Sequence, residues 1–288
     1  MKQLKLIQLY CTICHHYDTI LAAEVQRLSN NFRPEFTDEE CLAAIIFGIA
    51  EGEFEVKVIH RFTREYWADW FPQLPSYQNF NRRLNLLAPV LVKLYGLLLC
   101  TKEQSQITTH LLDSMPIVVA NQKRAKGATA ANGLCDKGYC ASKGMYYYGV
   151  KLHVLGQKQY ETLPKMKMLR VSAASENDIA VAKQWLTGVR NMDVFADKMY
   201  ADKTWKYDLS LRGVNIFTPV KLAKGQKSLD SADKLFSTAV SRTRQALESF
   251  FNWIHQKTHI QYAAKVRSDN GLISFIFARL VALAFFYS

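Results

Sequence analysis

Apolar positions follow one pattern in the first third of the chain and another in the remainder. Up to about residue 105 they recur at three- and four-residue steps, the spacing of one helix face. The clearest helix start is at Thr37, where Thr-Asp-Glu-Glu precedes the apolar run LAAIIFGIA and matches a capping box. Further helices are expected at Val56–Trp67 and Tyr77–Leu99, the second interrupted at Pro89. The pattern predicts an all-helical region over residues 1–105.

From Gln106 onward, short β-branched or aromatic runs alternate with helical segments. Strands are expected at Gln106–Leu112, Met145–Leu155, Met166–Ser172, Met192–Ala196 and Val214–Pro219. Helices are expected at Asn177–Arg190, between Asp197 and Arg212, and at Lys234–Lys257, whereas the Gly-, Ala- and Lys-rich segment Asn121–Gly144 is predicted to be a loop. This alternation predicts an α/β domain with a mixed sheet over residues 106–288.

The positive charge is confined to this second part. The chain carries a formal net charge of +12, with a pI of about 9.4. Residues 1–105 hold 11 Lys and Arg against 12 Asp and Glu, whereas residues 106–288 hold 26 against 13. A polyanion such as nucleic acid is therefore expected to bind mainly to the second part.

Composition excludes several classes of protein. With 49% hydrophobic and 12% aromatic residues, the chain can bury a substantial core, which excludes intrinsic disorder. The N-terminus lacks the apolar core and cleavage site of a secretory signal, so a cytoplasmic protein with reduced thiols is expected. The apolar stretch Gly271–Tyr287 contains Arg279 and is interpreted as a buried helix, not as a membrane span.

Three carboxylates are candidates for a metal site. Asp113 and Asp197 each follow an apolar strand-like run, where a sheet presents functional groups at its rim. Glu248 lies on the long predicted helix, on one face with Arg244 and His255. Such carboxylates suit two Mg²⁺ or Mn²⁺ ions acting on phosphate oxygens. An Asp in these positions is more often a cap or a salt-bridge partner, so the residues alone leave both interpretations open.

Five segments in one order resemble a known family: FPQLPSYQNFNRRLNLL, LLDSMPI, YYYGVKLHVL, VFADKMYAD and RQALESFFNWI, with KVRSDNGLISFIFARLVALAFF at the carboxyl end. Together they are similar to insertion-sequence DDE transposases, and most of all to the insertion-sequence nine-eighty-two family. The resemblance covers nearly the whole chain. It implies an RNase H-like core, with Asp113, Asp197 and Glu248 as the catalytic metal ligands.

The same resemblance implies further features of the site. The family's signature around the Glu runs Tyr, Arg, Glu, Lys, and here Ser241 and His255 stand at the Tyr and Lys positions. Arg244 is expected to position Glu248 or a phosphate, while contact of the DNA end by His255 or Lys257 stays open. Tyr200 fits the family pattern but also fits a tyrosine packed beneath the sheet. The implied partners are the terminal repeats of a mobile element and target DNA, with a homodimer acting on two ends and no nucleotide cofactor.

Basic side chains near these carboxylates are expected to contact DNA phosphates without reading sequence. In the predicted loop they are Lys123, Arg124 and Lys126, and after the last strand they are Lys221 and Lys224. If the helical region touches DNA, its contacts are expected among Arg61, Arg64, Arg82 and Arg83, which lie in its basic second half.

Other interpretations are kept beside this one. Cys11-x-x-Cys14-His15-His16 lacks a second ligand pair at zinc spacing and is interpreted as thiols without metal. Asp178 is expected to cap or open a helix, or to approach the metals, and His153 is expected to face the site or the core. Two rival functions are a nuclease of the same fold that does not join strands and an inactive transposase-derived DNA-binding protein.

Overall fold

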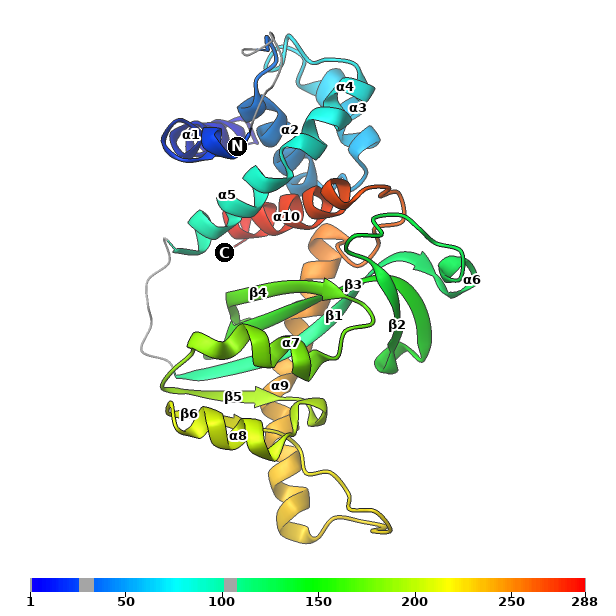
Figure 1. Ribbon diagram of the computed structural model, residues 1–288. Helices are drawn as coiled ribbons and strands as arrows, with labels where there is room; N and C mark the ends of the chain where they lie inside the picture. The colour runs from blue at the N-terminus through cyan, green and yellow to red at the C-terminus, as the bar shows by residue number, and fades with distance from the viewer. Residues whose placement is uncertain (1, 26–33, 101–107, 288) are drawn as a thin grey trace. The chain divides into compact units, whose positions relative to one another are not determined.

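The computed structural model describes residues 2–25, 34–100 and 108–287, and the chain divides into two compact units. Residues 1–103, 129–133 and 254–288 form a helical unit, and residues 104–128 and 134–253 form a sheet unit (Figure 1). The division differs from the expected one at the C-terminus, where the last 35 residues belong to the helical unit. The expected boundary at residue 105 and strand start at Gln106 lie outside the described residues.

The helical unit is built on an apolar core shared by five helices near the N-terminus and one at the C-terminus. The helices are α1 (Lys2–Thr19), the 3₁₀ turn η1 (Leu21–Glu24), α2 (Asp38–Ala50), α3 (Val56–Tyr66), α4 (Tyr77–Leu86), α5 (Ala88–Cys100) and α10 (Asp269–Phe286). The capping box at Thr37 is confirmed: its side chain accepts from the Glu40 amide, and Glu40 accepts from the Thr37 amide. The interruption expected near Pro89 is confirmed at Leu87, between α4 and α5.

Helix α10 is the core helix of this unit. It packs against α5, α2 and α4, and Leu272, Ile276 and Leu280 are fully buried. Among the described residues it is the one helix long and apolar enough to cross a membrane, yet 56% of that stretch is buried within the fold. Its Arg279 donates to the carbonyls of Thr258, Phe275 and Phe54, and burial lowers the pKa of this guanidinium to about 9. These contacts support the interpretation of the stretch as a buried helix.

The sheet unit contains one mixed six-stranded sheet. Its strands are β1 (Thr109–Asn121), β2 (Asp136–Cys140), β3 (Met145–Gln157), β4 (Lys165–Ala173), β5 (Met192–Ala196) and β6 (Val214–Phe217). The order is β2-β3-β1-β5-β6, with β4 pairing β3 beyond the end of β2. Strands β1, β5 and β6 are mutually parallel, and β3 is antiparallel to β1, β2 and β4. The expected mixed α/β sheet is therefore confirmed.

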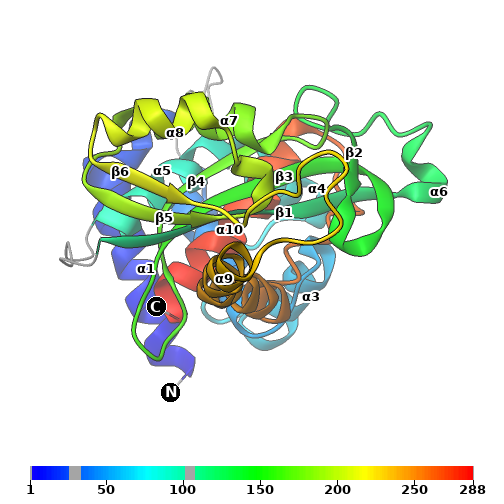
Figure 2. The ribbon, with the colours of Figure 1, turned by 90° about the horizontal axis from the view of Figure 1, so that it is seen from below.

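Helices cover both faces of this sheet (Figure 2). The helices of this unit are the short α6 (Gln122–Ala125), α7 (Asp178–Trp185), α8 (Lys203–Ser210) and the long α9 (Ser231–Thr258). Its 3₁₀ turns are η2 (Ala141–Lys143), η3 (Leu186–Gly188) and η4 (Lys198–Tyr200). On one face α7 and α8 bury Ala182 and Leu209 against Leu112 and Val194. On the other face lies α9, whose Leu247 approaches Gly156 of β3.

Two expectations for the sheet were wrong in their bounds. β1 does not end before Asp113 but continues to Asn121 through Pro116, which is paired with Lys151 of β3. The predicted loop Asn121–Gly144 contains strand β2 and helix α6. Its Gly138 is required in that strand, because a Cβ there would lie 2.3 Å from the Ala174 carbonyl oxygen.

Candidate active site

The parallel pairing of β1 and β5 places two aspartates side by side. Its last matched pair is Leu112 and Ala196, so Asp113 and Asp197 are the next residues on adjacent strands. β5 ends at Ala196, and the Asp197 side chain accepts a hydrogen bond from the Lys198 amide at the start of η4. A sheet edge at the carboxyl end of a parallel strand is where ligands commonly bind in such folds. The two carboxylates predicted from the sequence are thus brought together.

Arg244 of α9 spans both carboxylates. Its Nη2 donates to Asp113 Oδ2 at 2.8 Å, and its Nη1 lies 3.6 Å from Asp197 Oδ1. The guanidinium is largely buried, with 11% of the side chain exposed, against 21% for Asp113 and 35% for Asp197. Its Nε is buried without a hydrogen-bond partner among the described residues. The arginine therefore neutralises an acidic pair, with one donor left unsatisfied.

Burial dominates the acidity of Asp113. Desolvation raises the pKa of this carboxyl to about 6, although Arg244 and the hydrogen bond from the Ser114 amide both act to lower it. The nearby Asp197 charge adds to the rise. The charged form of this carboxyl is still favoured above pH 6, so it is available as a negatively charged ligand at neutral pH.

Tyr200 is packed in the core of the sheet unit, which is one of the two interpretations stated for it. Its ring is 1% exposed and belongs to the core between the sheet and helices α7 and α8. Its hydroxyl is buried without a hydrogen-bond partner among the described residues. Burial raises its pKa well above the usual value, and the charges of Asp178, Asp113 and Asp197 add to this rise. Tyr200 is therefore a neutral, unsatisfied polar group at the base of the acidic site.

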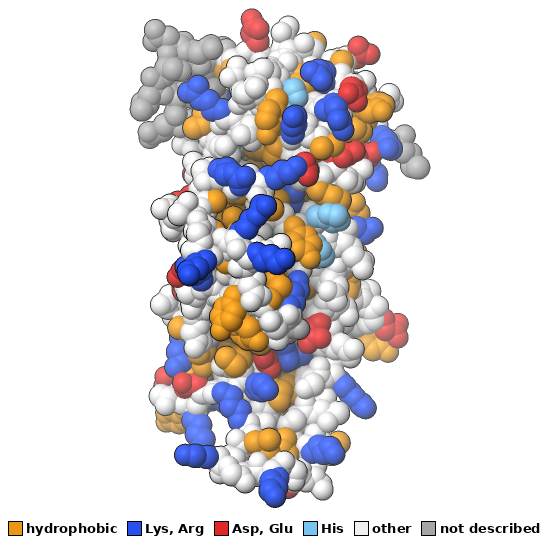
Figure 3. Space-filling view, turned by 90° about the vertical axis from the view of Figure 1, so that its right-hand side faces the viewer, with side chains coloured by type: hydrophobic (Ala, Val, Ile, Leu, Met, Phe, Trp, Pro, Cys, Tyr) orange, Lys and Arg blue, Asp and Glu red, His pale blue; other side chains and the backbone are white. Residues whose placement is uncertain are grey.

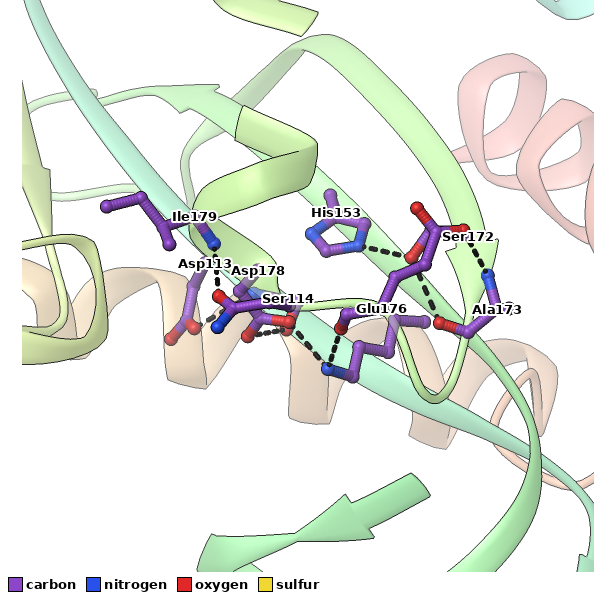
Figure 4. Close-up of polar contacts among 10 residues, drawn as sticks. Asp113, Ser114, His153, Ser172, Ala173, Glu176, Asp178 and Ile179 are labelled. Atoms are coloured by element: carbon purple, nitrogen blue, oxygen red, sulfur yellow. Dashed lines mark hydrogen bonds and ion pairs between the residues drawn. The ribbon is translucent and has the colours of Figure 1, made fainter. Parts of the chain in front are cut away.

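A second polar network occupies the strand positions next to Asp113 (Figure 4). Asp178, at the start of α7, accepts from Ser114 Oγ at 3.0 Å and from Lys151 Nζ at 2.7 Å. Helix α7 is capped by Asn177, whose side chain accepts from the Ile179 amide, and Asp178 opens the helix as its first residue, as expected, while forming an ion pair with Lys151. Lys151 was not predicted from the sequence, although a lone lysine in the apolar strand YYYGVKLHVL indicates a buried ion pair.

His153 belongs to the core and not to the acidic site. It is 1% exposed, and its Nε2 lies 2.9 Å from Ser172 Oγ (Figure 4). Burial lowers its pKa to about 4, so the ring is neutral under ordinary conditions. This geometry decides between the two placements left open by the sequence.

Glu248 is not gathered with the two aspartates. It lies one turn after Arg244 on α9 but is exposed, on the side of the helix that carries Ser241 and Gln245. Among residues 2–25, 34–100 and 108–287, no group of three or more His, Cys, Asp or Glu side chains is arranged to hold a metal ion. Glu248 instead lines a cleft of about 440 Å³ with Arg242 and Lys234.

That cleft adjoins a larger basic one. Lys234 and Leu229 also line a neighbouring cleft of about 830 Å³, together with Lys198 and Lys221. Lys198 directly follows Asp197, so the joined clefts lead from beside the acidic pair to Glu248. Lys198 was not singled out from the sequence, although its position next to a candidate ligand was the available signal.

The remaining predicted DNA contacts have different surroundings. Lys123, Arg124, Lys126, Lys224 and Arg82 are exposed. Arg83 serves the fold of the helical unit: it donates to the Thr37 carbonyl, lies 3.7 Å from buried Asp38 and covers the Phe36 ring. His255 lies in the part of α9 within the helical unit, where its ring meets those of His259 and Tyr262.

The two cysteines of the motif on α1 are not disulfide-bonded. Cys11 is exposed and Cys14 is half-buried, and both are free thiols. Burial raises the pKa of Cys14. The neighbouring rings of His15 and His16 meet edge to face at 5.3 Å.

The donor set at Asp113 and Asp197 fits a hard divalent cation. Both ligand groups are carboxylates, which Mg²⁺ and Mn²⁺ prefer, and an arginine cation already bridges them. Of the three predicted ligands, only these two residues are placed to bind such a cation together, since Glu248 faces the neighbouring cleft.

Comparison with known protein families identifies the domain that contains these residues. A family model described as a transposase DDE domain matches residues 103–268, more than half of the 288 residues, and this segment contains both aspartates, Arg244 and Glu248. No curated protein and no solved structure matches the chain. With its acidic pair on adjacent strands and its family match over most of the sheet unit, the chain belongs to the transposase DDE domain family.

Proposed function

We propose that the protein cuts DNA at the ends of a mobile element and transfers the freed 3′-hydroxyl into target DNA, as a member of the insertion-sequence nine-eighty-two family. The observation that carries this is the position of Asp113 and Asp197, each directly after the last matched pair of the β1–β5 ladder and within the family match. The strand order and the helices on both faces support an RNase H-like core. The partner of a transposase is DNA, and we expect this protein to be located in the cytoplasm.

In this proposal Asp113, Asp197 and Glu248 hold two Mg²⁺ or Mn²⁺ ions. When bound, such ions activate the attacking oxygen and stabilise the leaving one in an in-line displacement. The two aspartates supply oxygen ligands from rigid strand positions, and Tyr200 keeps water from beneath them. Arg244, released from the carboxylates, is then available to a phosphate of the DNA strand.

Completion of the site requires Glu248 to turn toward the aspartates. Arg244 and Glu248 are four residues apart on α9, so their side chains project within about 40° of each other around the helix. A change in the side chain of Glu248 or a small rotation of α9 would bring it toward the site that Arg244 now fills. We propose that this change accompanies binding of DNA and metal.

The joined basic clefts are the proposed track for the DNA strand. Lys198, Lys221 and Lys234 line it without an opposing carboxylate in the larger cleft. Because each is exposed and flexible, these lysines suit phosphate contacts that do not read sequence. In the helical unit, Lys57, Arg61 and Arg64 of α3 line a separate cleft of about 660 Å³ and are the proposed contacts there, with exposed Arg82.

The function is tested with labelled duplexes carrying the two ends of the element, incubated with protein and Mg²⁺ or Mn²⁺. We expect metal-dependent cleavage at the end and a joined product with an unrelated target duplex. Cleavage without a joined product would instead support a nuclease. Specific end binding without cleavage under any metal condition would support an inactive DNA-binding derivative.

We expect Glu248→Gln to lower cleavage by at least about a hundredfold, because one metal ion would lose a charged ligand. The matched control is Ser249→Ala, at the next residue of α9, which is exposed, lines neither of the joined clefts and should cleave at nearly the rate of the wild type. Both changes lie at exposed positions and should leave the thermal midpoint unchanged. Full activity of the Glu248 variant would show that another residue is the third ligand.

A further inference from the structure

The hairpin of β2 and β3 presents two tyrosines to solvent. Tyr139 and Tyr146 are directly opposite each other across the two strands, and their side chains are 52% and 60% exposed. Their ring centroids lie 4.9 Å apart with the planes tilted by 51°. On the opposite face of the same hairpin, Cys140 and Tyr147 are buried in a small core. The hairpin thus has a buried face and an aromatic outer face.

A cross-strand aromatic pair can exist for stability alone, because such pairs hold two strands in register. Here register is already fixed by Tyr147 and Cys140 in the core and by Gly138, whose missing side chain admits the Ala174 carbonyl. Apolar ring surface left in water also contributes less to folding than buried ring surface. The two rings therefore form a paired aromatic surface that is free to bind a ligand.

One cation lies on this aromatic face, and others follow the end of the neighbouring strand β1. Lys137 is exposed and lies two residues before Tyr139, on the same face of β2. β1 ends at Asn121, opposite Tyr147, and leads directly into the exposed Lys123, Arg124 and Lys126. The nearby Asp136 is engaged by Ser175, whose hydrogen bond lowers the pKa of that carboxyl. Figure 3, which looks at the side where Figure 1 shows α6 and β2, has blue basic side chains set among orange hydrophobic ones.

We propose that Tyr139 and Tyr146 form a stacking platform for unpaired DNA bases, with the neighbouring basic side chains holding the phosphates of the same strand. Aromatic rings in a cationic setting bind single strands because every base has a face that can stack and every nucleotide has a charge. A second protein surface would need acidic groups to match these cations. The inference rests on the proposed function in DNA transposition and adds that part of the DNA is held unpaired at this hairpin.

The test compares binding of two labelled DNAs by fluorescence anisotropy: a blunt duplex, and the same duplex with a single-stranded thymine tail. The double variant Tyr139→Ala, Tyr146→Ala should bind the tailed duplex about tenfold more weakly than the wild type does. Its affinity for the blunt duplex should be unchanged. The double variant Tyr139→Phe, Tyr146→Phe should bind both as the wild type does, because stacking needs the ring and not the hydroxyl. Tyr207→Ala, at a 65% exposed tyrosine on α8, is the matched control.

Three results would overturn the platform. One is wild-type affinity of the double alanine variant for the tailed duplex. Another is an equal loss for the tailed and blunt duplexes, which would indicate damage to the fold. The third is a different oligomeric state of the double alanine variant, measured by light scattering, which would make the tyrosines a contact between copies of the chain. If the wild type cleaves element ends while the double alanine variant binds the tailed duplex normally, only the platform proposal fails. If the wild type binds neither duplex, the proposed function fails as well.

Discussion

Asp113→Asn is expected to lower metal-dependent cleavage of element ends by at least about a thousandfold, which corresponds to roughly 4 kcal/mol of transition-state stabilisation. Asparagine keeps the shape of the side chain but has no charge, so it binds a hard divalent cation poorly. The same loss is expected for Asp197→Asn, because the two residues occupy matching positions on β1 and β5. Cleavage rates with Mg²⁺ and with Mn²⁺, under single-turnover conditions, measure the effect.

Asp208→Asn is the matched control, since this aspartate is exposed on α8 within the same unit. It should leave cleavage within a factor of about two of the wild type. Circular dichroism and a thermal melt establish that the Asp113 variant is folded. A folded Asp113→Asn protein that still transfers strands with Mg²⁺ would contradict the assignment of this residue as a metal ligand.

The sequence predicted those parts of the fold that local chemistry specifies. Thr37 and Glu40 form their capping box from residues three apart, and the short apolar run before Asp197 forms β5 as expected. The predicted strand ended at Leu112 with the apolar run, whereas β1 continues through Pro116, a residue that normally argues against a central strand. In the structure β5 ends at Ala196, so β1 has only one neighbouring strand where Pro116 lies, and proline is tolerated there.

Long-range partners were the part that the sequence could not supply. The apolar stretch of α10 predicts burial but does not say that its partners are α2, α4 and α5, which are distant in sequence. Helical spacing placed Arg244 on one face with Glu248, yet it did not reveal that Arg244 bridges Asp113 and Asp197. Nor did it reveal that Asp178 is paired with Lys151. Both ion pairs depend on the packing of helices on the sheet, which the family resemblance does not describe residue by residue.

Arg244 is expected to oppose metal binding at the site that it stabilises. In the absence of metal its guanidinium offsets the repulsion between two carboxylates, one of them largely buried. A divalent ion between the same oxygens must displace it. Arg244→Gln should therefore lower stability without metal by roughly 2 to 3 kcal/mol, because partly buried carboxylates lose their partner. The same variant should bind Mn²⁺ about tenfold more tightly, because no cation has to be displaced.

The loss of stability and the gain in Mn²⁺ affinity have opposite signs. Together they distinguish an arginine that occupies the metal position from one that only stabilises the fold. A thermal melt of the Arg244→Gln protein should show a lower midpoint without metal and a larger rise on adding Mn²⁺ than the wild type shows. Titration calorimetry gives the Mn²⁺ affinity directly, without any DNA or turnover. The matched control is Arg242→Gln, an exposed arginine two residues earlier on α9, which should change neither quantity. If loss of Arg244 weakened Mn²⁺ binding, the arginine would instead be holding the carboxylates in place for the metal.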